Sequence, residues 1–319
     1  MADKTYKVLL TNSILRQEHE RLARHAEVIV APRTDGDTLR ALIADVDGLI
    51  VRAKLPDDIF DYQTRLKGVV RHGVGLDMIP MGEASRKKIP VANIPGSNTA
   101  SVVEYCLNAM FYLRRNLARL DLDKNKLDWD ATRTPANGMS ELAGQTLGIV
   151  GVGAIGGALA TVAVALGMRV IGLARRKESL PSYVEFCDKR QLFSQADIVV
   201  LSCPLTPQTQ GLVDAQTLAF MKSSSLLINV SRGPVVHTQA LVQALLDKKL
   251  GGAALDVHDV QPIPAGLYPD ELDNLLLTPH VAGITESSMA RMSIGSVDEI
   301  VRALQGRRFA NLVNPDVYS

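Results

Sequence analysis

The stretch that most constrains the fold is a glycine-rich turn inside a strand–turn–helix–strand pattern at residues 146–173. Apolar residues 146–150 predict a buried strand, residues 154–166 a helix, and residues 168–173 a second strand. The turn carries a G-x-G-x-x-G made of Gly151, Gly153 and Gly156. In such a motif the first glycine permits a tight bend, the second lets the backbone approach a pyrophosphate, and the third lets the helix pack on the strand. The helix start would direct its N–H groups and positive dipole end at phosphate. The stretch therefore predicts a dinucleotide-binding unit.

The end of the second strand of this unit indicates which dinucleotide is bound. An NAD site usually places Asp or Glu about 20 residues past the glycines, where it accepts from the ribose 2′-hydroxyl. The sequence has Ala174 there, followed by Arg175, Arg176 and Lys177. A carboxylate would repel a 2′-phosphate, whereas guanidinium groups would bind one. A solvated basic turn is the plainer interpretation of this run, but its position favours NADP(H), with NAD(H) as the alternative.

Composition and charge exclude several classes of protein. A length of 319 residues suggests about two domains. A net charge of +1 and an aromatic content of 4% argue against nucleic-acid or membrane-surface partners. The three cysteines lack metal-ligand spacing, and their odd number argues against a disulfide framework. The N-terminus lacks a signal-peptide pattern, and no apolar run approaches a membrane span. We therefore expect a cytoplasmic protein without a metal site.

The remaining pattern predicts an α/β fold built from two doubly wound parallel-sheet (Rossmann-like) domains. Apolar strand patterns alternate with helical patterns on both sides of residue 98, and a long helix is expected over 98–120 and a closing helix over 285–304. The expected strands are 7–11, 27–30, 48–51, 66–70 and 91–94 in the first series, and 146–150, 168–173, 184–187, 198–202, 226–230, 253–255 and 275–277 in the second.

Three strand ends of the second series carry polar side chains toward the edge where ligands bind in such sheets: Arg232, Asp256 and His280. Each has an ordinary structural interpretation, since a strand-end Arg often forms an ion pair and a lone His is often structural. Together they suit hydride transfer to a 2-keto acid. Arg can bind a carboxylate and polarise a carbonyl through its forked donors, and His can donate a proton near neutral pH.

The sequence resembles the D-isomer-specific 2-hydroxyacid dehydrogenase family over essentially its full length. Seven ordered motifs carry the resemblance: Gly73-Val74-Gly75-Leu76-Asp77, Ser97-Asn98-Thr99-Ala100-Ser101-Val102-Val103-Glu104, the glycine turn, Cys203-Pro204-Leu205-Thr206, Asn229-Val230-Ser231-Arg232-Gly233, Ala253-Ala254-Leu255-Asp256-Val257 and Thr278-Pro279-His280-Val281-Ala282-Gly283.

The resemblance implies a discontinuous substrate-binding domain of residues 1–98 plus 286–319, and a dinucleotide-binding domain of residues 99–285, with the active site in the cleft between them. It also implies a homodimer joined through the cofactor domain, with the helix after Asn98 contributing, and D-stereospecific oxidoreduction.

The resemblance further assigns roles to single residues. Arg232 would hold and polarise the substrate, His280 would be the acid/base, and Asp256 would hold the nicotinamide carboxamide. The backbone N–H groups of Val74 and Gly75 would bind the substrate carboxylate, with Arg52 nearby. The cofactor would be bound by Gly151, Gly153, Ala154, Ile155, Gly156, Ala174, Arg175, Arg176, Cys203, Val230, Ser231, Asp256 and Gly283.

Two positions depart from the common family pattern. Ala174 stands where NAD-using relatives carry Asp, as in NADP(H)-dependent glyoxylate/hydroxypyruvate reductases. Gln261 stands where most relatives pair a Glu with the catalytic His, and we expect it to orient His280 without neutralising its charge. Formate dehydrogenases of the superfamily also carry Gln there. A formate dehydrogenase-like enzyme and a catalytically weak dinucleotide-sensing protein are therefore the alternatives to an NADP(H)-dependent reductase of a small 2-keto acid.

Overall fold

The computed structural model describes residues 6–115, 117 and 129–318. The chain divides into two compact units, the first made of residues 1–98 and 284–319 and the second of residues 99–283. The chain thus returns to the first unit at residue 284, two residues before the predicted domain boundary at 286. Which unit binds substrate and which binds dinucleotide stays a prediction. Across the described residues, no helix combines the length and the apolar character needed to span a membrane.

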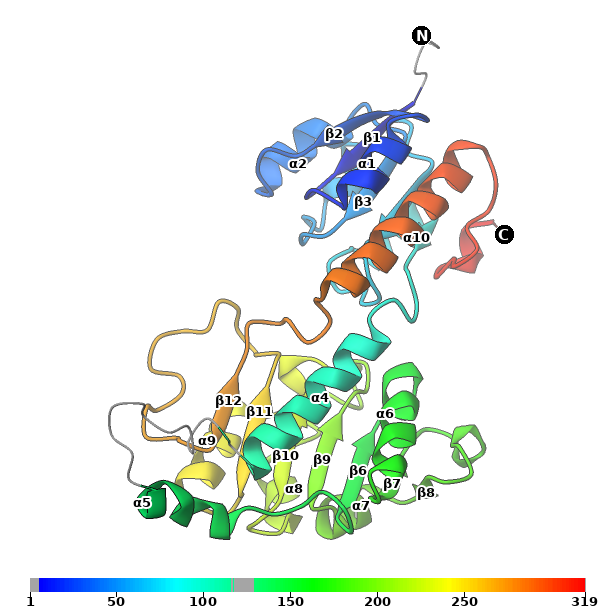
Figure 1. The fold of residues 1–319 in the computed structure, drawn as a ribbon. Coiled ribbons are helices and arrows are strands. Elements are labelled where there is room, and N and C mark those ends of the chain that lie inside the picture. Colours follow the sequence, from blue (N-terminus) through cyan, green and yellow to red (C-terminus); the bar gives the residue numbers. More distant parts are fainter. Residues whose placement is uncertain (1–5, 116, 118–128, 319) are drawn as a thin grey trace. The chain divides into compact units, whose positions relative to one another are not determined.

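The first unit is built on a parallel sheet of five strands in the order β2-β1-β3-β4-β5. Figure 1 labels β1, β2 and β3 of this sheet. In this sheet β2 lies on one side of β1, whereas β3, β4 and β5 follow on the other side, so the strand order changes direction between β1 and β3. In open parallel sheets, ligands bind at the carboxyl ends of the strands next to such a change of direction. The strands are β1 (Lys7–Leu10), β2 (Glu27–Val30), β3 (Gly48–Val51), β4 (Gly68–Arg71) and β5 (Val91–Ala92).

Successive side chains along the strands of this sheet point to opposite faces, so a hydrophobic core lies on each face. Leu9 packs on one face with α2 and α3, whereas Val8 and Leu10 pack on the other with α1 and α10, as the two-residue period of a strand requires. The covering helices are α1 (Arg16–Leu22), α2 (Gly36–Ile43), α3 (Met81–Arg86) and α10 (Glu286–Leu304), with short 3₁₀ turns η1 (Ile59–Asp61) and η6 (Pro315–Tyr318).

The second unit holds a parallel sheet of seven strands in the order β12-β11-β10-β9-β6-β7-β8 (Figure 1). Its order reverses between β6 and β9, which is where the glycine turn leaves the sheet. The strands are β6 (Thr146–Val150), β7 (Arg169–Leu173), β8 (Glu185–Phe186), β9 (Ile198–Leu201), β10 (Leu226–Asn229), β11 (Gly252–Leu255) and β12 (Leu275–Leu277).

Helices cover both faces of this second sheet. One face packs against α4 and α6, and the other packs against α7, α8 and α9. These helices are α4 (Thr99–Arg114), α6 (Ala154–Ala165), α7 (Lys189–Gln195), α8 (Ala215–Phe220) and α9 (Thr238–Leu246). Two doubly covered parallel sheets confirm the predicted fold class.

The structure differs from the predicted elements mainly at their ends. The strand expected at 91–94 is only β5, because the chain turns away beyond Ala92. The helix expected over 98–120 ends at Arg114, and most of the residues after it lie outside the described ranges. The polar stretch beyond contains a short helix, α5 (Trp129–Arg133), and a 3₁₀ turn, η3 (Thr134–Gly138), neither of which has a buried residue.

Candidate active site

The glycine turn between β6 and α6 has room for a phosphate-bearing ligand. Gly151 adopts φ +92°, and a Cβ there would lie 2.7 Å from the Cα atom of Cys203. A Cβ on Gly156 would lie 2.4 Å from the carbonyl oxygen of Gly151. By contrast, a Cβ on Gly153 would meet no atom within 4 Å, and Gly153 caps α6 without a side-chain hydrogen bond to the first N–H groups of the helix. Open space before an uncapped helix start fits a dinucleotide pyrophosphate.

The strand order brings the predicted residues of the second unit to one edge of its sheet. Arg232 follows β10, Asp256 follows β11 and His280 lies three residues after β12, and these are consecutive strands of the sheet. The predicted cofactor residues occupy the same edge or the adjoining turns: Gly151, Gly153, Ala154, Ile155 and Gly156 between β6 and the first turn of α6, Ala174 with Arg175 and Arg176 after β7, Cys203 after β9, Val230 and Ser231 after β10, and Gly283 after β12.

Asp256 organises the turn that carries His280. Its carboxylate is buried and accepts hydrogen bonds from the hydroxyl of Thr278 at 2.7 Å and from the backbone N–H groups of Val281 and Ala282 at 2.7 and 2.9 Å. Within the same turn His280 adopts φ +58°, and its N–H donates to the Thr278 carbonyl at 3.0 Å. The carboxylate therefore fixes the backbone that follows His280 and the side chain of Thr278 before it. Contact with a nicotinamide carboxamide stays a prediction for Asp256.

A tyrosine from α4 extends this network. The hydroxyl of Tyr105 lies 2.7 Å from the hydroxyl of Thr278. Since Thr278 donates its proton to Asp256, Tyr105 must donate to Thr278. Burial raises the pKa of Tyr105 to about 12, so the phenol keeps the proton that it donates. Neither Tyr105 nor Thr278 was predicted as a site residue. Thr278 could have been identified from its place beside Pro279 and His280, but nothing in the pattern of α4 marks Tyr105.

The turn that carries Arg232 is also fixed by short contacts. The Asn229 side chain accepts from the Ser231 N–H at 3.0 Å and from the Ser231 hydroxyl at 2.6 Å, and donates to the Arg232 carbonyl at 3.1 Å. A Cβ on Gly233 would lie 2.1 Å from the carbonyl carbon of His258, so the β10 and β11 loops touch there. Arg232 itself is half-buried and donates to the Ser231 carbonyl at 2.7 Å.

Gln261 lies on the exposed loop after β11, and its amide nitrogen is 3.5 Å from the carbonyl oxygen of His258. The buried His258 ring links this loop to the next strand, because its Nε2 lies 3.0 Å from the Thr278 carbonyl oxygen and its Nδ1 lies 3.2 Å from the Tyr268 hydroxyl. The pairing of Gln261 with His280 stays a prediction.

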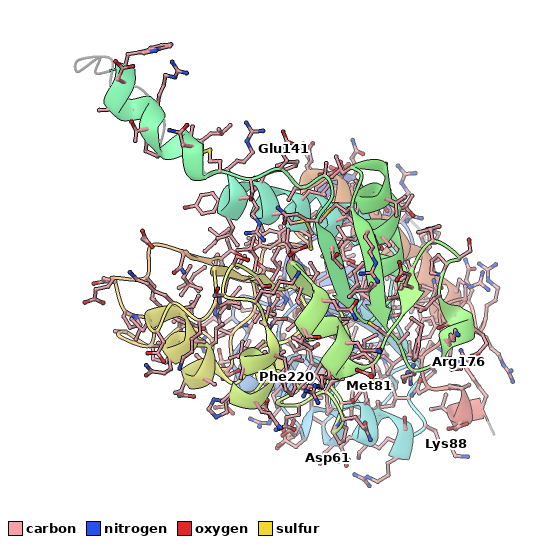
Figure 2. All side chains as sticks on the ribbon, turned by 90° about the horizontal axis from the view of Figure 1, so that it is seen from below. Asp61, Met81, Lys88, Glu141, Arg176 and Phe220 are labelled. Atoms are coloured by element: carbon pink, nitrogen blue, oxygen red, sulfur yellow. The ribbon has the colours of Figure 1, made fainter. Side chains whose placement is uncertain are left out.

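The cations predicted to bind the ribose 2′-phosphate follow β7, and their contact with a cofactor stays a prediction. Arg175 and Arg176 are exposed on the loop between β7 and the 3₁₀ turn η4 (Lys177–Ser179), where Figure 2 labels Arg176. Neither guanidinium forms an ion pair with a described residue. Both are therefore available to an anionic ligand.

In the first unit, the predicted carboxylate-binding loop is held by side chains that sequence reasoning did not select. Arg71 donates to the Gly75 and Val51 carbonyls at 3.0 Å each, and Asn93 donates to the Val74 carbonyl at 2.7 Å. Arg71 lies two residues before the Gly73–Asp77 motif, so its nearness to the motif was the available signal. These bonds fix the backbone of Val74 and Gly75.

His72, the next residue of the same strand end, is a buried and neutral histidine. Its Nε2 lies 2.9 Å from the Ser293 hydroxyl on α10. Burial, and then the positive charges of Arg52 and Arg71, lower the pKa of His72 to about 3. The imidazole thus adds no positive charge to this edge of the sheet at neutral pH.

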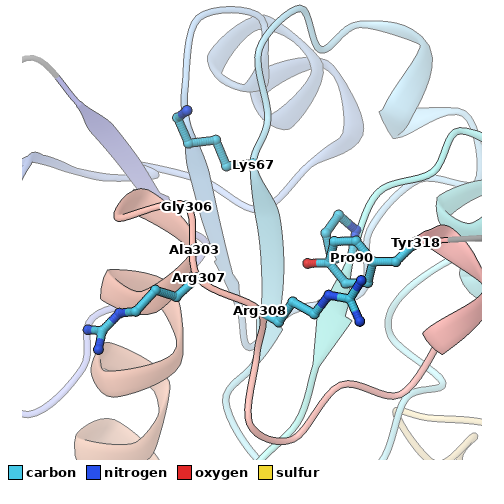
Figure 3. Close-up of a pocket in the computed structure, with 7 residues that line it drawn as sticks. All are labelled: Lys67, Pro90, Ala303, Gly306, Arg307, Arg308 and Tyr318. Atoms are coloured by element: carbon cyan, nitrogen blue, oxygen red, sulfur yellow. The ribbon is translucent and has the colours of Figure 1, made fainter.

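A separate hollow of about 270 Å³ lies beside the C-terminal end of α10 and contains none of the predicted site residues. It is lined by Lys67, Pro90, Ala303, Gly306, Arg307, Arg308 and Tyr318. Figure 3 shows the Lys67 and Arg307 head groups pointing apart, while the Arg308 guanidinium lies 4.5 Å from the centre of the Tyr318 ring. Because the cations do not converge, we assign no ligand to this hollow.

The seven-stranded sheet, its open glycine turn and the polar side chains on consecutive strand ends define a dinucleotide-dependent α/β oxidoreductase. Residues 107–282 match the family described as D-isomer specific 2-hydroxyacid dehydrogenase, NAD binding domain. The chain belongs to this family. It is therefore an enzyme that oxidises or reduces small 2-hydroxy or 2-keto acids with a nicotinamide dinucleotide, as the motifs predicted.

Named relatives cover nearly the whole chain. A hydroxypyruvate reductase of Thermotoga maritima is 31% identical over 94% of this chain and 98% of the relative. An (S)-sulfolactate dehydrogenase of Chromohalobacter salexigens is 38% identical over 82% of this chain and 85% of the relative. Among solved structures, an NADPH-dependent glyoxylate/hydroxypyruvate reductase of Sinorhizobium meliloti in complex with NADP and malonate is 26% identical with a TM-score of 0.83, covering 98% of this chain and 97% of that one.

Proposed function

We propose that this enzyme reduces a small 2-keto acid to the D-2-hydroxy acid with NADPH as its preferred cofactor. The observation that carries the proposal is the edge of the second sheet, where Arg232, Asp256 and the turn of His280 follow the consecutive strands β10, β11 and β12, and where the glycine turn follows β6. Glyoxylate and hydroxypyruvate are the substrates named for two relatives, and sulfolactate is named for a third.

The residues divide the chemistry between them. When bound, the nicotinamide supplies the hydride. Arg232 binds the substrate carboxylate and polarises the keto group through its forked donors. His280, as imidazolium, delivers a proton to the carbonyl oxygen as that oxygen gains negative charge. The N–H groups of Val74 and Gly75 are proposed to bind the carboxylate from the first unit, and Gln261 to orient the imidazole.

Cofactor preference rests on the loop after β7. Ala174 offers no carboxylate to a ribose 2′-hydroxyl, and Arg175 and Arg176 are exposed and lack acidic partners among the described residues. A 2′-phosphate would find two guanidinium groups there. The relative solved with NADP supports the same choice.

The direct test is a spectrophotometric screen of NADPH oxidation with glyoxylate, hydroxypyruvate, pyruvate and 3-sulfopyruvate, followed by chiral analysis of the product. Formate oxidation with NADP⁺ and NAD⁺ serves as the competing activity. We expect reduction of at least one keto acid to its D-product. Arg232→Ala should lose substrate affinity and turnover, and His280→Ala should lose about a hundredfold or more in kcat with cofactor binding retained. Formate oxidation without keto acid reduction, or full activity of His280→Ala, would refute the assignment.

We also propose that the enzyme is a cytoplasmic homodimer that contacts its partner through the second unit. Phe111 and Tyr112 near the C-terminal end of α4 are 43% and 37% exposed, and Trp129 at the start of α5 is 62% exposed. Exposed apolar side chains suit an interface between subunits. Light scattering should give twice the chain mass, and Phe111→Glu with Trp129→Glu should halve it; a monomeric wild-type protein would disprove this arrangement.

A further inference from the structure

The carbonyl oxygen of Thr278, two residues before His280, is contacted by two nitrogen atoms. The N–H of His280 donates to it at 3.0 Å, and the Nε2 atom of His258 lies 3.0 Å from it. Asp256 bonds the side chain of Thr278 and the backbone that follows His280. The backbone that precedes His280 is therefore contacted by a different group, the ring of His258 on the loop after β11.

The backbone of His258 is fixed by its neighbours, so its ring extends from a defined position. His258 is 5% exposed. A Cβ on Gly233 would lie 2.1 and 2.2 Å from the carbonyl carbon and oxygen of His258, so the turn after Arg232 packs directly against it. The next residue, Asp259, accepts a hydrogen bond at 2.7 Å from the hydroxyl of Thr238 at the start of α9. The ring thus joins the loop after β12 to a backbone segment that the loop after β10 and α9 hold in place.

The partners of the His258 ring determine which of its nitrogens carries hydrogen. A backbone carbonyl can only accept, so Nε2 must donate to Thr278. In the neutral ring Nδ1 is then an acceptor, and the hydroxyl of Tyr268 lies 3.2 Å from it. Burial, and then the negative charge of Asp259, raise the pKa of Tyr268, and a hydrogen bond with Thr238 does not reverse this effect. The phenol therefore keeps the proton that it donates to Nδ1, and the two rings meet edge to face with their centroids 5.9 Å apart.

The orientation of the Thr278 carbonyl bears on His280 because only one residue separates them. His280 adopts φ +58°, a backbone conformation that non-glycine residues disfavour, so the turn depends on outside contacts. We propose that His258 is a positioning residue for His280: its Nε2–H holds the Thr278 carbonyl, and Tyr268 keeps the ring in the tautomer that can donate there. This inference rests on the proposed function, since His258 acts only through the proposed proton donor, and it adds the residue that sets the placement of that donor.

Three replacements of His258 separate its hydrogen bond to Thr278 from the volume of its ring. His258→Phe keeps a ring of similar size and removes both nitrogens. His258→Gln keeps an amide N–H near the place of Nε2, so it can still donate to the Thr278 carbonyl. His258→Asn carries the same amide one methylene shorter, near the place of Nδ1, and does not reach that carbonyl.

Tyr268→Phe removes only the hydroxyl that selects the tautomer, and Tyr183→Phe is its matched control. The Tyr183 hydroxyl lies 2.7 Å from the Thr161 hydroxyl on α6, and Tyr183 precedes β8, at the opposite end of the strand order from β12. The control therefore removes a tyrosine hydroxyl bond from the same unit without touching the turn of His280.

The measured quantities are kcat and KM for the keto acid that wild type reduces fastest, the Kd of NADPH from fluorescence, and the melting temperature. We expect His258→Phe and His258→Asn to lower kcat by about tenfold, because small displacements of a reacting group are costly. KM and the Kd of NADPH should stay within about twofold, since neither depends on the imidazole of His280. His258→Gln should restore most of the lost kcat, Tyr268→Phe should lower kcat by about threefold, and Tyr183→Phe should leave it unchanged.

A double-mutant cycle tests whether the effect passes through His280. In the His280→Ala background there is no imidazole to position, so adding His258→Phe should lower the residual kcat no further. The same fold-loss with and without His280 would show that His258 acts by another route and would overturn the inference.

Two further results would overturn it. Full kcat in His258→Phe would show that the ring only fills volume, and equal losses in His258→Gln and His258→Asn would exclude the bond to Thr278 as the cause. If the His258 variants do not fold, judged by their melting temperatures, Tyr268→Phe decides, because it leaves His258 in place; a kcat equal to that of Tyr183→Phe would then count against the inference. Failure of the proposed function is distinguishable, because wild type would then reduce no 2-keto acid or His280→Ala would be fully active.

Discussion

Replacing Asp256 by Asn tests whether its carboxylate holds the histidine turn. The carboxylate accepts three hydrogen bonds, at 2.7, 2.7 and 2.9 Å, from Thr278, Val281 and Ala282. In Asp256→Asn one oxygen can still accept from Thr278 and Val281, but the amide nitrogen faces the Ala282 N–H, which is also a donor. One charge-assisted bond, worth about 1.5–3 kcal/mol, is lost, and two others become neutral bonds worth about 1 kcal/mol each.

The removal of a buried charge partly offsets these losses, because Asp256 is only 2% exposed. We therefore expect Asp256→Asn to lower the free energy of unfolding by about 2–3 kcal/mol, measured by urea denaturation. Because the turn then holds the imidazole loosely, kcat should fall by about tenfold to a hundredfold. Thr278→Val, which removes only the Thr278 and Tyr105 bonds, should have a smaller effect on both quantities.

Asp214→Asn is the matched control for this experiment. Asp214 caps α8 by accepting from the Thr217 N–H at 2.8 Å, and Asn is an equally good N-cap. Stability and kcat should therefore be nearly unchanged in the control. If Asp256→Asn behaved like the control, the carboxylate would not position His280. A rise in the KM for NADPH with kcat preserved would instead favour the predicted contact between Asp256 and the nicotinamide carboxamide.

Three further predictions concern charge. Wild type should favour NADPH over NADH by about tenfold or more in kcat/KM, and Arg175→Ala should reduce that preference; a wild-type preference for NADH would exclude the assignment. Gln261→Glu should move the alkaline limb of the pH profile for keto acid reduction upward, because a carboxylate raises the pKa of an imidazolium that it contacts; coincident limbs would show that Gln261 is not the partner of His280. Burial lowers the pKa of His72 from its ordinary value of 6.5 to about 3 in the folded state, so below pH 6.5 the unfolded state binds the extra proton and stability falls as pH decreases toward 3. His72→Gln should flatten that acid limb in urea titrations at several pH values, by up to about 1.4 kcal/mol per pH unit, and an unchanged slope would show that His72 does not cause it.

Local patterns in the sequence predicted the sheets and the edge that bears the candidate site. Apolar runs separated by helical patterns require parallel strands with crossover helices, and the carboxyl ends of such strands share one edge. That reasoning is sufficient to assign Arg232, Asp256 and His280 to one edge of the sheet from the sequence alone. The same argument placed Arg52 near the end of a strand in the first unit.

The supporting contacts could not be predicted from the sequence because they join residues that are far apart in the chain. Tyr105 and Thr278 are 173 positions apart, and His72 and Ser293 are 221 positions apart. Each pair depends on the rotation of a helix, α4 or α10, against its sheet, and hydrophobic periodicity fixes only which face of a helix is buried. Which polar residue on that face meets a strand end is decided by packing.

The backbone of His280 explains why so many donors converge on Asp256. A non-glycine residue at φ +58° costs about 1–2 kcal/mol relative to an ordinary conformation. Glycine would remove that cost, but it would also remove the imidazole that the chemistry needs. The bonds from Val281 and Ala282 to the buried carboxylate are large enough to offset the strain, and they act on the two residues that follow His280. The turn is therefore held in a conformation that its own sequence disfavours, and the group that holds it lies on the neighbouring strand. Stability of the turn and placement of the proton donor consequently depend on the same carboxylate, so a variant of Asp256 should affect both together.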